Sequence, residues 1–186
     1  MATTNDEDQS KDTIRDNTTI HDRIARYTGG RDTATEIWPM TETWVISKAG
    51  YIRYHKQFRD AKTKYRTDVE IKGASICTRH GPGEFVIHKS SHDELLRQSD
   101  PDLPNHYHYV VTRRVDGETA HMIADTTIPV TEMDRLIGLD GEYQWSRYQK
   151  SGPVRWAAHI PWTSIPEFSE REEEIRERAS AFRIDV

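Results

Sequence analysis

The sequence has no long apolar run, a single cysteine and no excess of basic residues, and each absence excludes a class of protein. No stretch of the 186 residues approaches the roughly 18 apolar residues that a membrane-spanning helix needs, and the first residues lack the apolar centre of a signal peptide. Cys77 alone cannot form an internal disulfide or a cysteine-based zinc cage. We therefore expect a cytoplasmic (intracellular) protein that has no membrane partner and needs no oxidation to fold.

Charge and length bound the organisation of the chain. Asp and Glu number 31 against 26 Lys and Arg, which gives a net charge of -5. This total does not exclude nucleic acid as a partner, because binding depends on how charge is distributed over the surface. The length fits one domain. We expect a disordered tail at residues 1–18, a single domain at 19–168 and a charged, solvated C-terminal helix or tail at 169–186.

The spacing of apolar residues predicts two short N-terminal helices, then a series of strands broken by further helices. Helical spacing covers 20–27, and a second helix begins at Asp32 or Thr33 and ends near Pro39. Alternation with a period of two then predicts strands, with turns at Gly50, at 59–64 and at 116–117. The expected strands are 43–47, 51–58, 65–76, 85–89, 106–115, 120–130 and 154–160, with helices at 91–98 and 131–137. This order predicts an α+β (mixed α/β) domain with a central mixed β-sheet flanked by helices.

The segment that best indicates chemistry is Asp60 followed by Glu70-Ile71-Lys72. In a strand, Glu70 and Lys72 project from one face and Ile71 from the other, so a carboxylate and an ammonium lie side by side. If Asp60 lies on a neighbouring strand, its carboxylate can approach that of Glu70. These two carboxylates and the Ile71 carbonyl form a partial oxygen shell of the kind that Mg²⁺ accepts, with Mn²⁺ as a substitute. Such a metal could bind a phosphate and activate water, with Lys72 orienting the water or offsetting charge.

These residues resemble the PD-(D/E)XK nuclease superfamily, whose mark is an acidic residue followed at some distance by Glu-x-Lys on the next strand. Asp60, Glu70 and Lys72 occupy those places, and small type II restriction endonucleases are the nearest analogy. Phe58 and Arg59, rather than a proline, precede Asp60, so Asp68 is an alternative first acid. Some members add a glutamate from an early helix. That implies Glu36 or Glu42 as a further ligand.

Basic and aromatic residues gather between Lys48 and Lys72, in an otherwise acidic protein. Such a segment concentrates positive potential where a phosphate backbone would lie. A run of solvated strand faces would give the same pattern. The residues expected to contact nucleic acid are Lys56, Arg59, Lys62, Lys64 and Arg66.

Histidines offer a second, different site. His106 and His108 project from one face of an expected strand, and His88 and His92 could join them to hold a metal, as in a cupin-like enzyme. Tyr107 and Tyr109 would then form the core face of that strand. Trp145, Trp156 and Trp162 could stack on bases, although large aromatic side chains more often belong to a core.

The sequence thus predicts a Mg²⁺-dependent endonuclease that hydrolyses DNA phosphodiester bonds, with a site-specific restriction endonuclease acting as a homodimer as the preferred form. Two alternatives stay open: a non-catalytic nucleic-acid-binding or regulatory protein on the same scaffold, and a His-ligated cupin-like metalloenzyme. Metal content and cleavage of DNA discriminate among the three.

Overall fold

A computed structural model describes residues 34–56, 59–114, 120–137, 141–149 and 154–182. The tail expected at 1–18, the helix at 20–27 and the turn at 116–117 lie outside these residues. The elements, in chain order, are α2 (Ala34–Ala49), β1 (Ile52–Lys56), β2 (Arg59–Lys62), β3 (Asp68–Ser75), β4 (Glu84–His88), α3 (Lys89–Arg97), β5 (His106–Arg114), β6 (Ala120–Pro129), α4 (Val130–Leu136), β7 (Ser146–Tyr148), β8 (Arg155–Pro161), the 3-10 turn η1 (Trp162–Ser164), α5 (Pro166–Ser169) and α6 (Glu172–Ser180).

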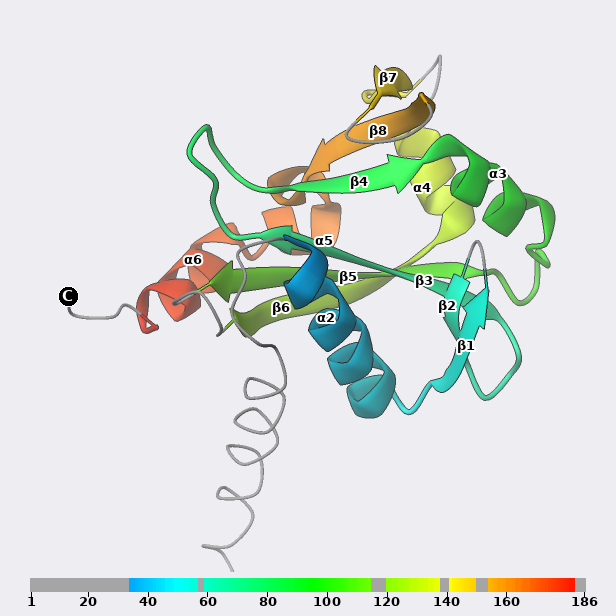
Figure 1. The fold of residues 1–186 in the computed structure, drawn as a ribbon, viewed down its shortest axis with the longest axis horizontal. Coiled ribbons are helices and arrows are strands. Elements are labelled where there is room, and N and C mark those ends of the chain that lie inside the picture. The colour runs from blue at the N-terminus through cyan, green and yellow to red at the C-terminus, as the bar shows by residue number, and fades with distance from the viewer. Residues whose placement is uncertain (1–33, 57–58, 115–119, 138–140, 150–153, 183–186) are drawn as a thin grey trace, which may run out of the picture.

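The central sheet has five strands in the order β1-β2-β3-β5-β6 (Figure 1). Strands β3 and β5 run parallel, and the other neighbours are antiparallel. The parallel pair requires a long crossover, which passes through β4 and α3. The expected α+β fold with a central mixed sheet and flanking helices is therefore confirmed.

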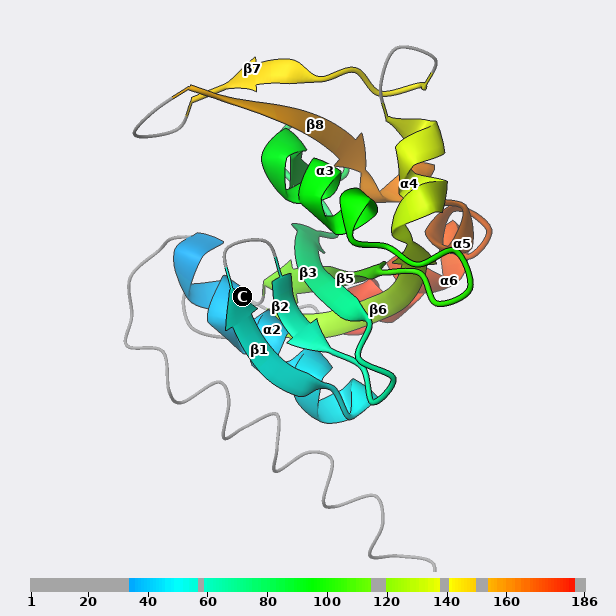
Figure 2. The ribbon, with the colours of Figure 1, turned by 90° about the vertical axis from the view of Figure 1, so that its right-hand side faces the viewer.

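A second, three-stranded antiparallel sheet has the order β4-β8-β7. Figure 2 shows it on one side of the central sheet, together with α3 and α4, while α2 lies on the other side. The main core between the two sheets contains Phe85, Ile87, Tyr107 and Tyr109, all fully buried. Sequence analysis missed β7, because three residues are too short for a period-two signal.

The strand expected at 43–47 is wrong, because these residues form the C-terminal part of the 16-residue helix α2. A short run of apolar and β-branched residues cannot be assigned to strand or helix by periodicity alone. Packing decides in favour of helix. Val45 is fully buried in a second core with Ala61, Val69 and Ile71, on the α2 face of the central sheet.

The turn expected at 59–64 is also partly wrong, because Arg59–Lys62 is the strand β2. It is short and carries three charged residues, which hides the alternation. Pairing with strands on both sides stabilises it, with Ala61 buried opposite Val69. This strand matters because it carries Asp60.

The C-terminal helix α6 is not simply solvated. Ile175 and Ala179, both 1% exposed, belong to the main core, and the helix lies against β6. Most of its charged residues are exposed, which explains why the composition alone indicated a solvated or partner-docking helix. None of the helices in the described ranges is long and apolar enough to cross a membrane.

Gly83 joins the two sheets where the chain leaves β3 and enters β4. Its N–H donates to the Ser75 carbonyl oxygen at 3.1 Å, and its own carbonyl accepts from the Trp162 N–H at 3.0 Å. A Cβ at this position would lie 2.1 Å from the Ser75 oxygen. Only glycine therefore permits this close approach of the two backbones.

Candidate active site

Strands β2 and β3 place the carboxylates of Asp60 and Glu70 on the same side of the sheet. In this antiparallel pair Ala61 lies opposite Val69, and Lys62 lies opposite Asp68. Continuing the register by one residue sets Asp60 opposite Glu70, and residues opposite one another project from the same face. Asp60 is 8% exposed and Glu70 is 6% exposed. The tertiary fold thus buries two acidic groups side by side.

A backbone hydrogen bond fixes the orientation of the Asp60 side chain. The N–H of Ile71 donates to Asp60 Oδ2 at 2.8 Å. The bond orients this carboxylate against the β3 backbone, within reach of the same segment that carries Glu70 and Lys72. A carboxylate held by a backbone amide loses rotational freedom and is pre-organised for a ligand.

Lys72 lies two residues beyond Glu70 on the same face of β3. Its Nζ is 2.5 Å from Glu70 Oε1, and both side chains are largely buried. The pairing follows directly from strand alternation, since residues i and i+2 share a face. It puts one cation next to two carboxylates, so the cluster keeps a net negative charge.

These side chains open onto one pocket of about 310 Å³. Asp60, Glu70, Lys72 and Gly73 line it from the central sheet, and Val86 and His88 line it from β4. The pocket therefore lies where the central sheet meets β4, on the face of β4 opposite Phe85 and Ile87. Sequence reasoning missed His88 as a member of this site, because only the crossover through the 76–83 loop brings β4 alongside β3.

The environment of the pocket shifts the pKa of two of its groups. Burial, and next the negative charge of Glu70, raise the pKa of Asp60 from 3.8 to about 6. Burial, followed by the positive charges of Lys72 and Arg155, lowers the pKa of His88. At neutral pH His88 is therefore uncharged. Asp60 is an anion there, and the nearby cations do not fully compensate its negative charge.

The donor set fits a divalent metal ion. Two buried carboxylates, one with a raised pKa, form a site that a cation would stabilise, and oxygen is the donor that Mg²⁺ prefers. Within the described ranges no three His, Cys, Asp or Glu side chains converge into a metal cluster. A Mg²⁺ ion bound by one or two carboxylates commonly takes its other ligands from water and substrate phosphate, which suits this arrangement.

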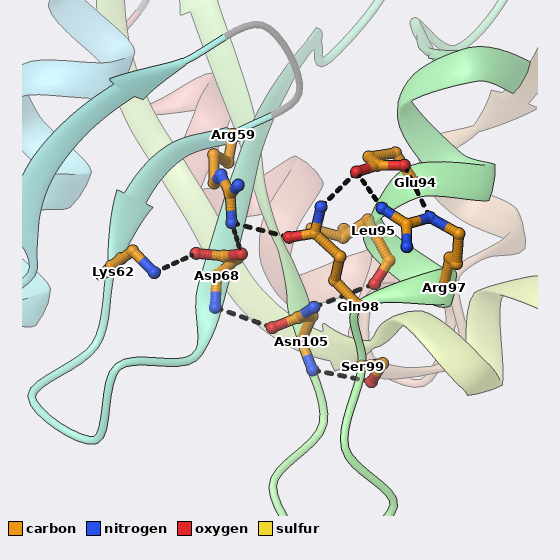
Figure 3. Close-up of polar contacts among 9 residues, drawn as sticks. All are labelled: Arg59, Lys62, Asp68, Glu94, Leu95, Arg97, Gln98, Ser99 and Asn105. Atoms are coloured by element: carbon orange, nitrogen blue, oxygen red, sulfur yellow. Dashed lines mark hydrogen bonds and ion pairs between the residues drawn. The ribbon is translucent and has the colours of Figure 1, made fainter.

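Asp68, the alternative first acid, lies outside the pocket lining and has other partners (Figure 3). Its carboxylate pairs with Arg59, and with Lys62 Nζ at 2.9 Å. Its N–H donates to Asn105 Oδ1 at 2.8 Å, and Asn105 in turn donates to the Leu95 carbonyl. With two cations already beside it, Asp68 ties β2 and β3 to α3 and leaves Asp60 as the acid that faces the pocket.

Of the two glutamates of α2 that could join the metal site, Glu42 interacts electrostatically with the carboxylate pair. Glu42 is 5% exposed, its Oε1 accepts from Arg53 at 3.3 Å, and its charge contributes to the raised pKa of Asp60. That electrostatic effect puts Glu42 within range of the carboxylate pair. Glu36 lies in the first turn of α2.

Basic residues of β1, β2 and the following loop surround two tyrosines. The cationic groups of Lys56, Arg59 and Lys62 lie 4.9, 5.6 and 4.8 Å from the centre of the Tyr54 ring. Lys64 lies over Tyr65, which is 68% exposed, and Arg66 is exposed with a φ of 68°. Asp68 neutralises part of the charge of Arg59 and Lys62, so among the described residues of this segment Lys56, Lys64 and Arg66 carry most of the uncompensated charge.

The expected gathering of four histidines is wrong. The register sets His106 opposite Val69 and His108 opposite Ile71, on the α2 face of the sheet. His88 lines the pocket on the other side, and His92 bonds to the Tyr107 hydroxyl there. Strand alternation separates the two pairs, because Tyr107 and Tyr109 face the main core.

His108 is buried within a polar network on the α2 face of the central sheet. Its Nε2 lies 3.1 Å from Asp125 Oδ2, and its Nδ1 lies 3.1 Å from the Tyr51 hydroxyl. Lys48 of α2 pairs with Asp125 at 2.6 Å. The network therefore links α2 to β5 and β6, which accounts for a buried histidine without a metal.

The comparison with known families agrees with this geometry. A PD-(D/E)XK nuclease superfamily domain matches residues 31–167. The chain therefore belongs to the PD-(D/E)XK nuclease superfamily, a class of phosphodiester-cleaving enzymes that act on nucleic acid and generally use divalent metal ions. No curated protein matches the chain.

Proposed function

We propose that the protein is a metal-dependent endonuclease that hydrolyses phosphodiester bonds in DNA. The observation that carries the proposal is that Asp60, Glu70 and Lys72, from two adjacent strands, line one pocket. Phosphodiester hydrolysis needs a means to activate water and a means to offset charge on the phosphate. A pair of carboxylates can hold a metal ion that activates water, and the lysine beside them can offset the charge on the phosphate.

In this proposal Asp60, Glu70 and the carbonyl of Ile71 hold Mg²⁺ or Mn²⁺, with Glu42 or Glu36 as a further acid. When bound, the divalent ion polarises the scissile phosphate and lowers the pKa of an attacking water. Asp60 must be ionised to bind the ion. Its Oδ2, held by the Ile71 amide, is already oriented before any ligand arrives.

Lys72 acts next to Glu70 as a cation fixed on a rigid strand. Its ammonium orients the attacking water or offsets the negative charge that develops on the phosphate. The 2.5 Å contact with Glu70 positions this group without a flexible loop. His88, uncharged at neutral pH, adds a polar wall on the β4 side.

We assign binding of the DNA backbone to the basic segment, the residues between Lys48 and Lys72. Lys56, Lys64 and Arg66 are exposed, and Arg59 and Lys62 belong to β2, the strand that carries Asp60. Contacts from such cations to phosphates release counterions, so binding should weaken steeply with salt. As in the type II restriction enzymes that the motif of Asp60, Glu70 and Lys72 resembles, a homodimer would match cleavage of both strands at a two-fold site.

The test is cleavage of supercoiled plasmid and labelled duplex DNA with Mg²⁺ or Mn²⁺. Glu70→Gln and Lys72→Ala should each reduce the cleavage rate by at least about a hundredfold, by analogy with the removal of one electrostatic catalytic group. Glu84→Gln and Lys89→Ala are matched controls, because both side chains lie outside the pocket. Sequencing of the cut ends and light scattering report the recognition site and the oligomeric state.

Two outcomes contradict the proposal. If the wild-type protein binds DNA with strong salt dependence but cuts no substrate, it is a non-catalytic binding protein on this scaffold. If the two pocket variants cut as fast as the wild type, the chemistry belongs to other residues.

A further inference from the structure

The outer end of the β7–β8 ribbon projects beyond the rest of the second sheet. Pairing of β4 with β8 ends at His88 opposite Ala157. Trp156 and Arg155 continue β8 and, among the strands that the structure describes, pair with β7 alone, through Arg147 opposite Trp156 and Tyr148 opposite Arg155. Figure 2 shows this end of β7 and β8 extending away from the central sheet. We call residues 146–148 and 154–157 the arm.

The arm exposes large and charged side chains on both of its faces. Trp156 is 52% exposed and Val154 is 43% exposed. Arg147 and Arg155 are also exposed. Alternation sets Trp156 and Arg147 on one face and Arg155 on the other.

The charge of the arm suits a polyanion. Residues 143–166 are the longest stretch of the chain without Asp or Glu, in a protein with 31 acidic residues, and they carry Arg147, Lys150 and Arg155. Within the part of the chain that the structure describes, neither Arg147 nor Arg155 makes an ion pair. A tryptophan between uncompensated arginines is typical of nucleic-acid contacts.

The arm also lies next to the candidate active site. Arg155 shares a face with Ala157 and, across the register, with His88, which lines the pocket. The charge of Arg155 is among those that lower the pKa of His88, which shows that the two groups are close enough to interact. The pocket is thus flanked by β2 of the basic segment on one side and by the arm on the other.

We infer that the arm inserts into a groove of duplex DNA beside the scissile phosphate, with Arg147 and Trp156 reaching the bases and Arg155 a neighbouring phosphate. The inference rests on the proposed function and names its substrate class. The major groove of B-form DNA admits a two-stranded β-ribbon, whereas the deep, narrow major groove of A-form RNA does not. Duplex DNA is therefore the substrate that fits.

The experiment measures binding separately from cleavage. Fluorescence anisotropy with labelled duplex DNA is recorded on the Glu70→Gln protein, alone and combined with Trp156→Ala or with Arg147→Ala and Arg155→Ala together. Trp156→Ala should weaken binding about tenfold, because the indole ring would no longer cover apolar base edges in the groove. The double arginine variant should lower the salt slope by about one unit for each arginine that no longer binds a phosphate. Duplex RNA of the same sequence should bind more weakly than DNA.

Arg178→Ala, at an exposed position of α6, is the matched control and should leave affinity and slope unchanged. Trp156→Phe keeps an aromatic ring and should restore most of the affinity, and circular dichroism verifies the fold of each variant. If the wild type cleaves DNA but the arm variants bind DNA as tightly as the Glu70→Gln protein, and the same arm substitutions in a protein that keeps Glu70 cut like the wild type, the arm inference fails and the proposed function stands. If the wild type neither binds nor cuts nucleic acid, both fail. A wild-type dimer that Trp156→Ala converts to a monomer, with DNA affinity unchanged, makes the arm an interface with a second copy and overturns the inference.

Discussion

The backbone amide of Ile71 donates a hydrogen bond to Asp60 Oδ2 over 2.8 Å, so the strand that carries Glu70 and Lys72 also holds the other acid of the pocket. The two acids lie ten positions apart in the chain and become neighbours only because β2 pairs with β3. This contact keeps a buried carboxylate in place even though its charged form is disfavoured by burial and by Glu70. The arrangement implies that the pocket is strained electrostatically until a cation binds.

Replacing Asp60 should separate stability from activity. Because its folded pKa of about 6 lies above the ordinary value of 3.8, the folded state binds more protons in that range, and stability falls as pH rises through it. Asp60→Asn keeps an acceptor for the Ile71 amide and removes the charge. We expect it to raise the free energy of unfolding at pH 8 by about 1–2 kcal/mol while abolishing cleavage. Urea unfolding at pH 4 and pH 8 checks this, with exposed Asp102→Asn as the unchanged control.

Metal affinity should rise with pH through about 6, because Asp60 must lose its proton before it can act as a ligand. Isothermal titration calorimetry with Mn²⁺ between pH 5 and pH 8 measures this, and binding should be accompanied by proton release. Asp60→Asn and Glu70→Gln should lose the binding. An affinity that stays constant across this range in the wild type would mean that Asp60 is not a ligand.

Gly83 should tolerate no side chain. A Cβ there would lie 2.1 Å from the Ser75 carbonyl oxygen, a backbone atom that cannot rotate away as the end of a side chain could. We expect Gly83→Ala to lower the free energy of unfolding by about 2–3 kcal/mol, as overpacking does. Gly50, with a φ of 64° and open space around it, is the control, and Gly50→Asn should change stability by less than about 1 kcal/mol. Equal effects of the two substitutions in denaturant unfolding would refute the close-approach argument.

Asp125 should stabilise the fold except in strong acid. Burial raises the pKa of Asp125, but hydrogen bonds from His108 and Lys48 lower it more, to about 2. The depressed folded pKa means that the stabilisation is complete above the unfolded value of about 4 and is lost as pH falls through 2. Asp125→Asn should therefore cost about 1–2 kcal/mol at pH 6 and nearly nothing at pH 2. Unfolding curves of both proteins across this range provide the check, and a difference that persists unchanged at pH 2 would point to packing instead of charge.

The local sequence pattern was sufficient to predict the part of the candidate site that lies on β3, namely Glu70 and Lys72. The alternation of Val69, Glu70, Ile71 and Lys72 predicts a strand with acid and base on one face, and β3 has that form. The same signal predicted β5 and β6, because long strands repeat the period often enough to be distinctive. It failed for 43–47, where burial of Val45 against Ile71 favours helix over strand.

The sequence by itself determined which residues could do the chemistry: a lysine and a glutamate two positions apart, an aspartate upstream, and a basic segment in an acidic chain. Only the tertiary structure decided which aspartate joins them. Asp60 faces the pocket because β2 is a strand in register with β3, while Asp68 is taken by Arg59 and Lys62. The tertiary structure also places His88 at the pocket, and His106 and His108 on the opposite face of the central sheet. The reason is physical: spacing along a strand fixes the face on which a side chain lies, but strand pairing and burial fix its neighbours, and these depend on contacts between distant parts of the chain.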